Sequence, residues 1–524
     1  MRGPGLLSCI LIAGCGGVDA PDREDEPAPE TPAPPPVTIK VTRNWLDDSG
    51  QITATEDLTG LVIQRATALI PNAAANGGFD ARVSETTASG PVIRNVPLGA
   101  TYTLDVEAAF GRAVYVTDAR DLDFKFYEMG RRNPAQPTTV TPLTVEVAGM
   151  TAWQDGDELL FHCARVAAFA GVTETQAGVS GWPVVGDTSL ALTVDWSNVD
   201  TGFFHDRKTP LIDGNLGDRL VVVHQRRLGS STDYPYNTIL ETAAFASFNQ
   251  SDGAARTVGA AFSTTPQDAI HIKLRQPEFV RYAADIHPDA AVPGGFVGGV
   301  DVRAQPADPL RKRMFGHSLS PVFTLFVAAG AEIDMGQMVY PRVPSSWSQW
   351  LCASHDFVIE RDTPFGIKQK VRSVIATTLP ITPGSPSTDL VTAVAPRISP
   401  PRSATLNGAV LAAPHSLPYQ PTGAPIEIRW EEPLLVTAAP TSYALTIYQL
   451  GVTGDEVTPT AIAAIAMPAK ARALSIPWQL FPGTGAYHVV LTAIAAEGEH
   501  DPKLTGPGPT DSAADAVSGI LSLK

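Results

Sequence analysis

The most reactive side chains in this 524-residue chain are its four cysteines, and one of them stands where a secretion signal would end. Arg2 supplies a positive start, residues 6–12 are mostly apolar, and Ala13 and Gly14 are two small residues directly before Cys15. A positive start, an apolar run and small residues before the cleavage point are the parts of an export signal. We therefore expect the chain to leave the cytoplasm.

The sequence IAGC at residues 12–15 resembles the lipobox of bacterial lipoproteins. The resemblance implies that a signal peptide, residues 1–14, is removed and that Cys15 becomes an acylated N-terminus held in a membrane. Gly16 replaces the Asp that retains lipoproteins at the inner membrane, which favours the outer membrane or cell surface and leaves the periplasmic side open. The leader is short for this family, so an apolar N-terminus that ends in Cys by chance is the alternative.

Removal of the leader would take Cys9 away, and with Cys15 acylated only Cys163 and Cys352 would keep a thiol. Outside the cytoplasm two such thiols can form a disulfide, which would close a long loop and stabilise the fold by about 5 kcal/mol. The alternative is that both are small apolar core residues, because Cys163 ends a strand-like run over residues 159–163. No later apolar run has the length that spans a bilayer, so the lipid is the only membrane attachment we expect.

One serine has neighbours that suggest a nucleophile. The sequence GHSLS at residues 316–320 comes close to the G-x-S-x-G elbow of serine hydrolases, in which a strained turn between a strand and a helix exposes the serine. The second glycine is missing, Pro321 follows, and residues 322–326 predict a strand where the elbow needs a helix. A turn that leads into a strand explains the segment, and we predict no catalytic residue.

The ten histidines show no spacing typical of a metal site. The sequence has no HExxH, CxxC or HxH pattern and no glycine-rich phosphate loop after a strand, so it predicts no metal, nucleotide or other cofactor. Two turns, residues 213–218 and 249–253, carry the oxygen ligands from which extracellular calcium sites are built. Turn formation by Asp, Asn and Gly is the alternative explanation for both.

Aromatic residues in polar surroundings suggest a binding surface for a sugar or a protein. Phe203 and Phe204 cannot both face inward on one strand, and Trp347 and Trp350 lie in a serine-rich segment that predicts a turn. We predict these four residues as an aromatic binding surface. Burial in a core, where large aromatic side chains contribute most, is the alternative.

The composition favours many short strands joined by turns. The chain has 46 Pro and 44 Gly, and charged residues amount to only 18%, below the roughly 25% of an average globular protein. Apolar and polar residues alternate over many short runs, as in half-buried strands. We therefore predict an all-β, multi-domain fold of antiparallel β-sandwich modules. The net charge of −16 argues against nucleic acid as a partner.

Both ends of the mature chain have compositions that disfavour a core. Residues 15–36 are rich in Pro and acidic side chains, and we expect a disordered linker that extends at most roughly 60 Å. Residues 497–524 are rich in Gly, Pro, Asp and Ala, and we expect a loose tail.

Residues 37–140 predict a first β-sandwich, since short alternating runs are separated by turn residues. Residues 95–106 resemble the closing strands of transthyretin-like and carboxypeptidase-regulatory-like sandwiches. The resemblance implies a small extracellular module without catalytic residues of its own.

Residues 141–397 form a β-rich middle region without clear module boundaries. Gly-Asp pairs at residues 156–157, 186–187 and 217–218 stand before strand-like runs at nearly equal spacings. The spacing predicts an internal repeat of paired strands or is a coincidence of common turn dipeptides. A β-propeller-like middle region is the alternative architecture, and residues 277–286 predict the one helix.

A strand that ends in Trp430, a long strand over residues 442–448 and Tyr487 near the start of another strand characterise residues 398–496. These features resemble a fibronectin type III or related immunoglobulin-like sandwich. The resemblance implies that Trp430 lies in the core and that the Tyr487 hydroxyl bonds back to the preceding loop, as in a tyrosine corner. Tyr102 has similar neighbours, so we expect it to close the first sandwich in the same manner.

Together these features predict a membrane-anchored surface lipoprotein with a binding or structural role in the cell envelope and an unknown ligand. Its expected partners are the membrane, through the lipid, and a polysaccharide or protein. The alternative is an envelope hydrolase whose active site is assembled from scattered residues of the middle region, since such sites escape motif reading. A cleft there with two carboxylates or a Ser–His pair within hydrogen-bond reach would favour the hydrolase.

Overall fold

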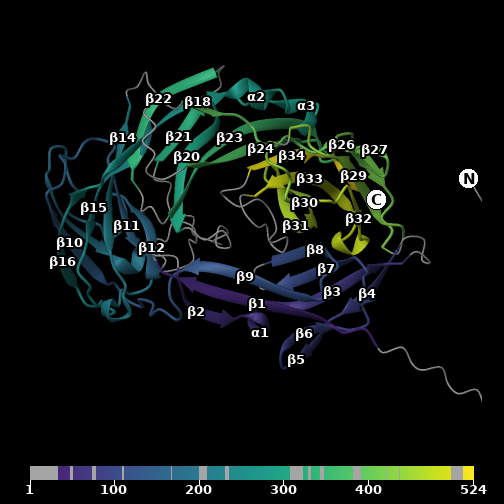
Figure 1. Ribbon diagram of the computed structural model, residues 1–524, viewed down its shortest axis with the longest axis horizontal. Coiled ribbons are helices and arrows are strands. Elements are labelled where there is room, and N and C mark those ends of the chain that lie inside the picture. Colours follow the sequence, from purple (N-terminus) through teal and green to yellow (C-terminus); the bar gives the residue numbers. More distant parts are fainter. Residues whose placement is uncertain are drawn as a thin grey trace, which may run out of the picture.

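The computed structural model describes residues 33–47, 51–72, 78–108, 111–166, 168–199, 209–229, 235–306, 323–328, 332–342, 347–381, 391–421, 423–435, 437–496 and 512–524. Strands make up most of this part of the chain and the helices are short, which confirms the predicted all-β, multi-domain sandwich fold. Four units, defined below by their strands, follow one another around a ring (Figure 1).

The first unit is a sandwich whose two sheets share a core around Ile39 and Leu104. In one sheet β1 pairs with β2 and β6 and runs parallel to β9, and β5 lies beyond β6. The other sheet has the order β4-β3-β7-β8. The strands are β1 (Val37–Leu46), β2 (Ile52–Asp57), β3 (Ile63–Pro71), β4 (Phe79–Val83), β5 (Glu85–Thr87), β6 (Gly90–Ile93), β7 (Tyr102–Ala108), β8 (Gly111–Thr117) and β9 (Asp121–Met129), with α1 (Thr59–Val62) between β2 and β3.

The second unit is a sandwich around the buried side chains of Phe161 and Trp196. One sheet has the order β13-β10-β16, and the other has the order β12-β11-β14-β15. The strands are β10 (Pro142–Ala148), β11 (Glu158–Cys163), β12 (Ala168–Val172), β13 (Ser189–Asp195), β14 (Val221–Leu228), β15 (Tyr236–Ala244), β16 (Arg256–Ala261) and β17 (Ser263–Thr264).

The third unit contains a long hairpin, β23–β24, which forms one side of a sheet of order β21-β20-β23-β24. The second sheet has the order β22-β18-β25. The predicted helix is present as two short pieces, α2 (Gln276–Val280) and α3 (Ala283–Ile286), which border the third unit (Figure 1). The strands are β18 (Gln267–Arg275), β19 (Ala290–Ala291), β20 (Phe296–Pro306), β21 (Phe323–Ala328), β22 (Glu332–Pro341), β23 (Trp347–Asp362), β24 (Lys368–Ile381) and β25 (Val391–Val394).

The fourth unit is a sandwich of the sheet β27-β26-β29-β32 and a sheet in which β30 and β33 are central. Trp430 is buried in its core, and the Tyr487 hydroxyl donates to the carbonyl of Gly483 at 2.8 Å, as the sequence predicts. The strands are β26 (Arg402–Leu406), β27 (Ala409–Val410), β28 (His415–Leu417), β29 (Ile426–Glu431), β30 (Ser442–Thr453), β31 (Glu456–Pro468), β32 (Ala473–Ile476), β33 (Gly485–Ala495), β34 (Ser512–Val517) and β35 (Leu521–Leu523).

Two predictions about the sandwich ends are wrong. Residues 512–523 are not loose, because β34 pairs with β33 and β35 pairs with both β33 and β28, and most of their side chains are buried. Small side chains such as Ala514 let this strand lie close to its neighbours. Tyr102 has a buried ring, but its hydroxyl donates forward to the carbonyl of Ala119 and not back to the preceding loop.

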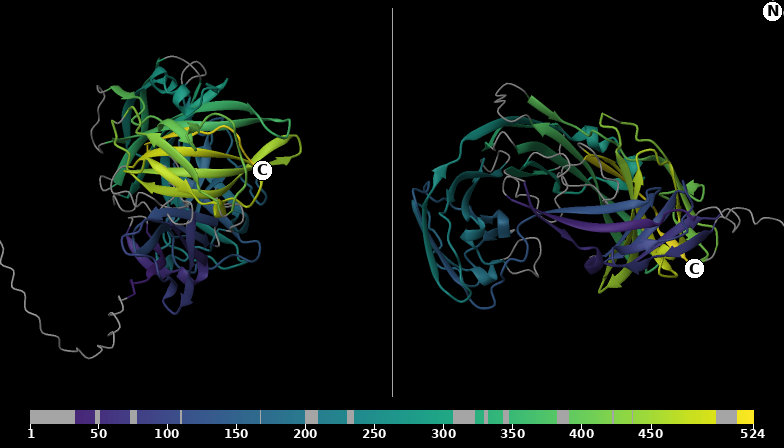
Figure 2. Two further views of the ribbon diagram at one scale, coloured as in Figure 1. Left: turned by 90° about the vertical axis from the view of Figure 1, so that its right-hand side faces the viewer. Right: turned by 60° about the horizontal axis from the view of Figure 1, so that its bottom comes forward.

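Strand pairing makes three of the four joints between the units. Strand β15 of the second unit pairs with β21 of the third, β24 of the third pairs with β34 of the fourth, and β31 of the fourth runs parallel to β8 of the first. At the fourth joint the chain runs directly from β9 of the first unit into the second, so the ring is closed, as Figures 1 and 2 show. Within residues 141–397 the described strands belong to two such units and do not form the repeated four-stranded blades of a propeller.

The joint between the fourth and first units is a shared sheet. Val114 on β8 packs into the large core of the third and fourth units, whereas Ala466 on β31 packs into the core of the first unit. Arg112 reinforces the joint, because it binds both carboxylate oxygens of Asp105 at 2.7 Å and donates to the carbonyl of Gln479 at 3.1 Å. Each unit thus contributes side chains to the core of the other.

Candidate functional site

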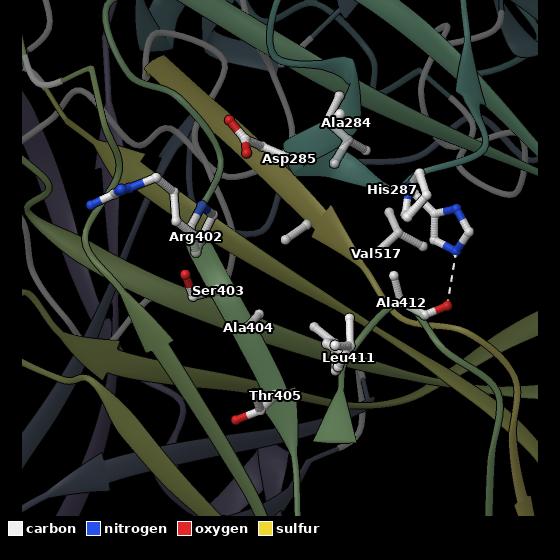
Figure 3. Close-up of a pocket in the computed structure, with 15 residues that line it drawn as sticks. Ala284, Asp285, His287, Arg402, Ser403, Ala404, Thr405, Leu411, Ala412 and Val517 are labelled. Carbon is white, nitrogen blue, oxygen red and sulfur yellow. Dashed lines mark hydrogen bonds between the residues drawn. The ribbon is translucent and has the colours of Figure 1, made fainter. Parts of the chain in front are cut away.

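A pocket of about 400 Å³ lies between α3 of the third unit and the fourth unit (Figure 3). Residues of β26, β27 and β34 form its other walls. Interfaces between domains are common places for ligand sites, and this volume falls within the usual range for small-molecule pockets.

Polar side chains border an apolar floor in this pocket (Figure 3). The floor contains Leu411 and Val517, both of which are buried. Burial raises the pKa of Asp285, and the nearby charge of Arg402 opposes that effect. The polar residues that border the floor are Asp285, Arg402, Ser403 and Thr405.

His287 also lines the pocket, but its ring is not placed to act as a base. Its Nε2 donates to the carbonyl of Ala412 at 3.2 Å, and its Nδ1 accepts from the backbone N–H of Asp289 at 3.1 Å. Burial lowers the pKa of His287, so the ring is neutral near pH 7. Since both nitrogens are occupied, the pocket offers hydrogen bonds and apolar contact to a ligand, and His287 does not activate Ser403.

A second group of titratable side chains lies inside the second unit. The ring of His224 bridges two carboxylates, with Nδ1 at 2.8 Å from Glu241 and Nε2 at 2.9 Å from Asp157. Arg226 binds the same carboxylate of Asp157 through Nε at 2.9 Å and Nη2 at 2.6 Å. Glu241 accepts two further bonds from Thr151, one from its backbone N–H and one from its hydroxyl.

This group is sealed from solvent. His224 is 0% and Glu241 2% exposed, and the indole of Trp153 stacks on the imidazole at a centroid distance of 5.1 Å. Burial acts to raise the pKa of Asp157, but the bonds from Arg226 and His224 outweigh it and lower the pKa to about 2. The carboxylates, the imidazole and the guanidinium satisfy one another, so the group holds β14, β15 and the turn before β11 together.

The Gly-Asp pairs predicted as a repeat share one local structure. Gly156, Gly186 and Gly217 all have positive φ, and each following carboxylate accepts a backbone N–H from a few residues earlier. At Asp218 the carboxylate also binds the buried guanidinium of Arg131, at 3.1 Å. This pair links the segment after β9 to the second unit. Since Asp157 binds Arg226, two of the three Gly-Asp turns bind a buried arginine.

The predicted calcium turns bind their own chain. Asp213 accepts from the N–H of Asn215, Asp252 accepts from the N–H groups of Thr138 and Thr139, and the Gln250 amide accepts from Ile212. No group of potential metal ligands is found in the part of the chain that the structure describes. Turn formation explains both segments.

The possible disulfide between Cys163 and Cys352 is not formed. Cys163 is packed in the core of the second unit on β11, whereas Cys352 lies on β23 of the third unit. The Thr378 hydroxyl donates to the Cys352 sulfur at 3.7 Å.

The predicted aromatic surface is not formed by the residues that can be placed. Trp347 and Trp350 lie in β23 and not in a turn, and Trp350 is 2% exposed. Strand β23 lies inside the sheet, with its backbone paired to β20 on one side and to β24 on the other, so this segment has no turn. Phe203 and Phe204, together with Cys15 and the GHSLS segment at residues 316–320, lie outside the described residues.

Comparisons with known proteins give no family for this chain. No protein-family model and no curated protein matches it. Among solved structures, the chicken CNTN1 FN1-FN3 domains match 74% of this chain and 99% of their own, with 10% identity and a TM-score of 0.13. A Streptococcal ancillary pilin matches 68% of this chain and 98% of its own, with 10% identity and a TM-score of 0.12. Scores this low do not describe a common arrangement of the units.

Proposed function

We propose that this protein is a lipid-anchored component of the bacterial cell envelope whose ring of β-sandwiches is a rigid binding scaffold. The closed ring is the observation that carries the proposal, because strand pairing at three joints and the Arg131–Asp218 ion pair at the fourth fix each unit relative to the next. Buried ion pairs such as Arg131–Asp218 hold the units in place. Because the two charged side chains of such a pair bind each other, neither is available to bind or activate a substrate. Such a body presents surfaces at fixed distances from one another.

The proposed anchor is Cys15, at the end of the lipobox-like sequence, with the outer membrane or cell surface as its location. The Pro- and acid-rich residues 15–36 would hold the ring clear of the lipid headgroups. None of the helices in the described ranges is long and apolar enough to cross a membrane.

Replacing Cys15 by alanine should abolish lipid attachment, because the thiol is the acceptor of the diacylglycerol. We expect wild-type protein in cells fed a fatty-acid analogue to carry the label and to sediment with membranes, and the Cys15→Ala protein to carry none. Cys9→Ala is the matched control, since Cys9 lies in the leader and its loss should leave labelling unchanged. Label retained in Cys15→Ala would contradict the proposal.

The pocket beside α3 supports a saccharide as the ligand. A sugar ring offers hydroxyls to the Asp285 carboxyl and to the side chains of Ser403 and Thr405, while its C–H face can lie on the apolar floor. The alternative hydrolase finds less support, because the one histidine ring described as bridging two carboxylates in the middle region, that of His224, is sealed from solvent and does not line a cleft.

Filling the pocket should remove saccharide binding. Ala404→Trp places an indole against the floor, and we expect the affinity for soluble fragments of envelope polysaccharide to fall more than tenfold in calorimetry. Ala409→Trp is the control, because Ala409 lies on the adjacent β27 but does not line the pocket. If Ala404→Trp and Ala409→Trp bind the polysaccharide fragments with equal affinity, the saccharide does not bind in this pocket.

A further inference from the structure

Arg361 places a positive charge inside the protein where the strand pattern calls for an apolar residue. It lies near the end of β23 on the same face as Phe357 and Ile359, which are fully buried, and it is itself 9% exposed. This end of the β23–β24 hairpin meets the fourth unit, where the Arg361 guanidinium donates to the carbonyl of Ser518.

The acceptors around Arg361 are neutral. Its Nε and Nη2 donate to the side-chain oxygen of Gln369 on β24 at 3.1 and 3.0 Å, and the third bond goes to the Ser518 carbonyl. No carboxylate lies within ion-pair distance among the described residues, whereas buried Arg131 and Arg226 each bind an aspartate. Burial of a cation without a counter-charge costs several kcal/mol, and here burial lowers the pKa of Arg361 to about 10.

Two buried polar atoms near this guanidinium have no partner among the described residues. A guanidinium has five N–H donors, and the three bonds described above leave two of them. The Nε2 of Gln369 belongs to the amide that Arg361 binds, and it is buried without a partner in the described structure. Nδ1 of His488 is buried without a partner in the same way, and the charge of Arg361 reaches this ring: burial first and that charge second lower the pKa of His488 to about 3.

We propose that a small inorganic anion of the size of chloride binds at this joint, held by Arg361 and by the side-chain N–H groups of Gln369 and His488. Such an ion supplies the missing negative charge and accepts hydrogen bonds from the N–H groups that have no partner in the protein. The site lies on the joint between the third and fourth units, so its occupancy stabilises the ring.

The test measures thermal unfolding of the full chain at constant ionic strength while chloride replaces gluconate, which is too large for a buried site. We expect the Tm of the wild type to rise on the order of 2 °C for each tenfold increase in chloride above its dissociation constant. Gln369→Glu supplies an internal carboxylate to Arg361, so this variant should lose the chloride dependence. Gln337→Glu adds the same charge at an exposed site on β22 and should keep it.

Either of two results would overturn the proposal. One is a wild-type Tm that does not distinguish chloride from gluconate, and the other is a Gln369→Glu protein whose Tm rises with chloride as the wild type does. Arg361→Met gives a further check if it folds, since it removes the cation and should abolish the dependence on chloride.

Discussion

Replacing Ala466 by arginine will open the ring while the separate sandwiches stay folded. Ala466 belongs to β31 of the fourth unit but is 3% exposed and packs in the core of the first unit. A guanidinium at this place would have no partner in that core, and the cost of several kcal/mol exceeds what one short strand contact supplies. Once the two units separate, the new side chain reaches water, so neither core needs to change.

Small-angle X-ray scattering measures this effect directly, as an increase in the radius of gyration of Ala466→Arg with unchanged circular dichroism. Ala464→Arg is the matched control, because Ala464 lies two residues earlier on the same face of β31 and is only half-buried. If both variants have the wild-type radius, the β8–β31 pairing does not close the ring in solution.

Replacing Asp157 by asparagine will destabilise the second unit by about 3–5 kcal/mol, the usual cost of removing one partner from a buried ion pair. The amide keeps only one acceptor oxygen and turns its NH2 group toward a donor of Arg226 or His224, and it loses the negative charge that the Arg226 guanidinium binds. Denaturant unfolding should show this loss as a lower midpoint. Asp187→Asn is the control, since Asp187 occupies the equivalent Gly-Asp turn, where its carboxylate accepts the backbone N–H of Val184 and no arginine among the described residues binds it.

Acid titration gives the same group a second, independent signature. The pKa of Asp157 is lowered from 3.8 to about 2 in the folded protein. Its contribution is therefore present above about pH 4 and disappears as the pH falls toward 2, which amounts to about 2.5 kcal/mol. Asp157→Asn should lack this part of the acid transition. An acid transition that is identical in the variant would show that Asp157 is not held by these bonds.

The sequence predicts the elements whose signal is local. Alternation in β1 places Val37, Ile39 and Val41 inside, and the spacing around Tyr487 correctly places its hydroxyl on the preceding loop. The same reasoning fails at Trp350, because a serine-rich segment looks like a turn unless the strands on either side of it are known. It also fails at residues 512–523, where Ala-rich strands have a composition that resembles that of a tail.

The candidate sites depend on contacts that the sequence does not show. His224 is a polar residue inside an apolar strand, which could have marked it as buried and paired, but its partners Asp157 and Glu241 lie on other elements. The pocket needs α3 and β26 to meet across the joint between two units. Strand pairing between units has no periodicity of its own, so the ring could not be predicted from alternation alone.

The closing joint also determines when this protein can finish folding. Arg112 and Leu480, which meet there, are 368 positions apart in the chain, and closing a flexible loop of that length costs roughly 5 kcal/mol of entropy. Contacts this distant in sequence form late, after the intervening sandwiches have shortened the path between the two ends. Before this joint forms, the chain is therefore an open arch with two bare sheet edges, which is the stage at which it is most exposed to aggregation and to proteases.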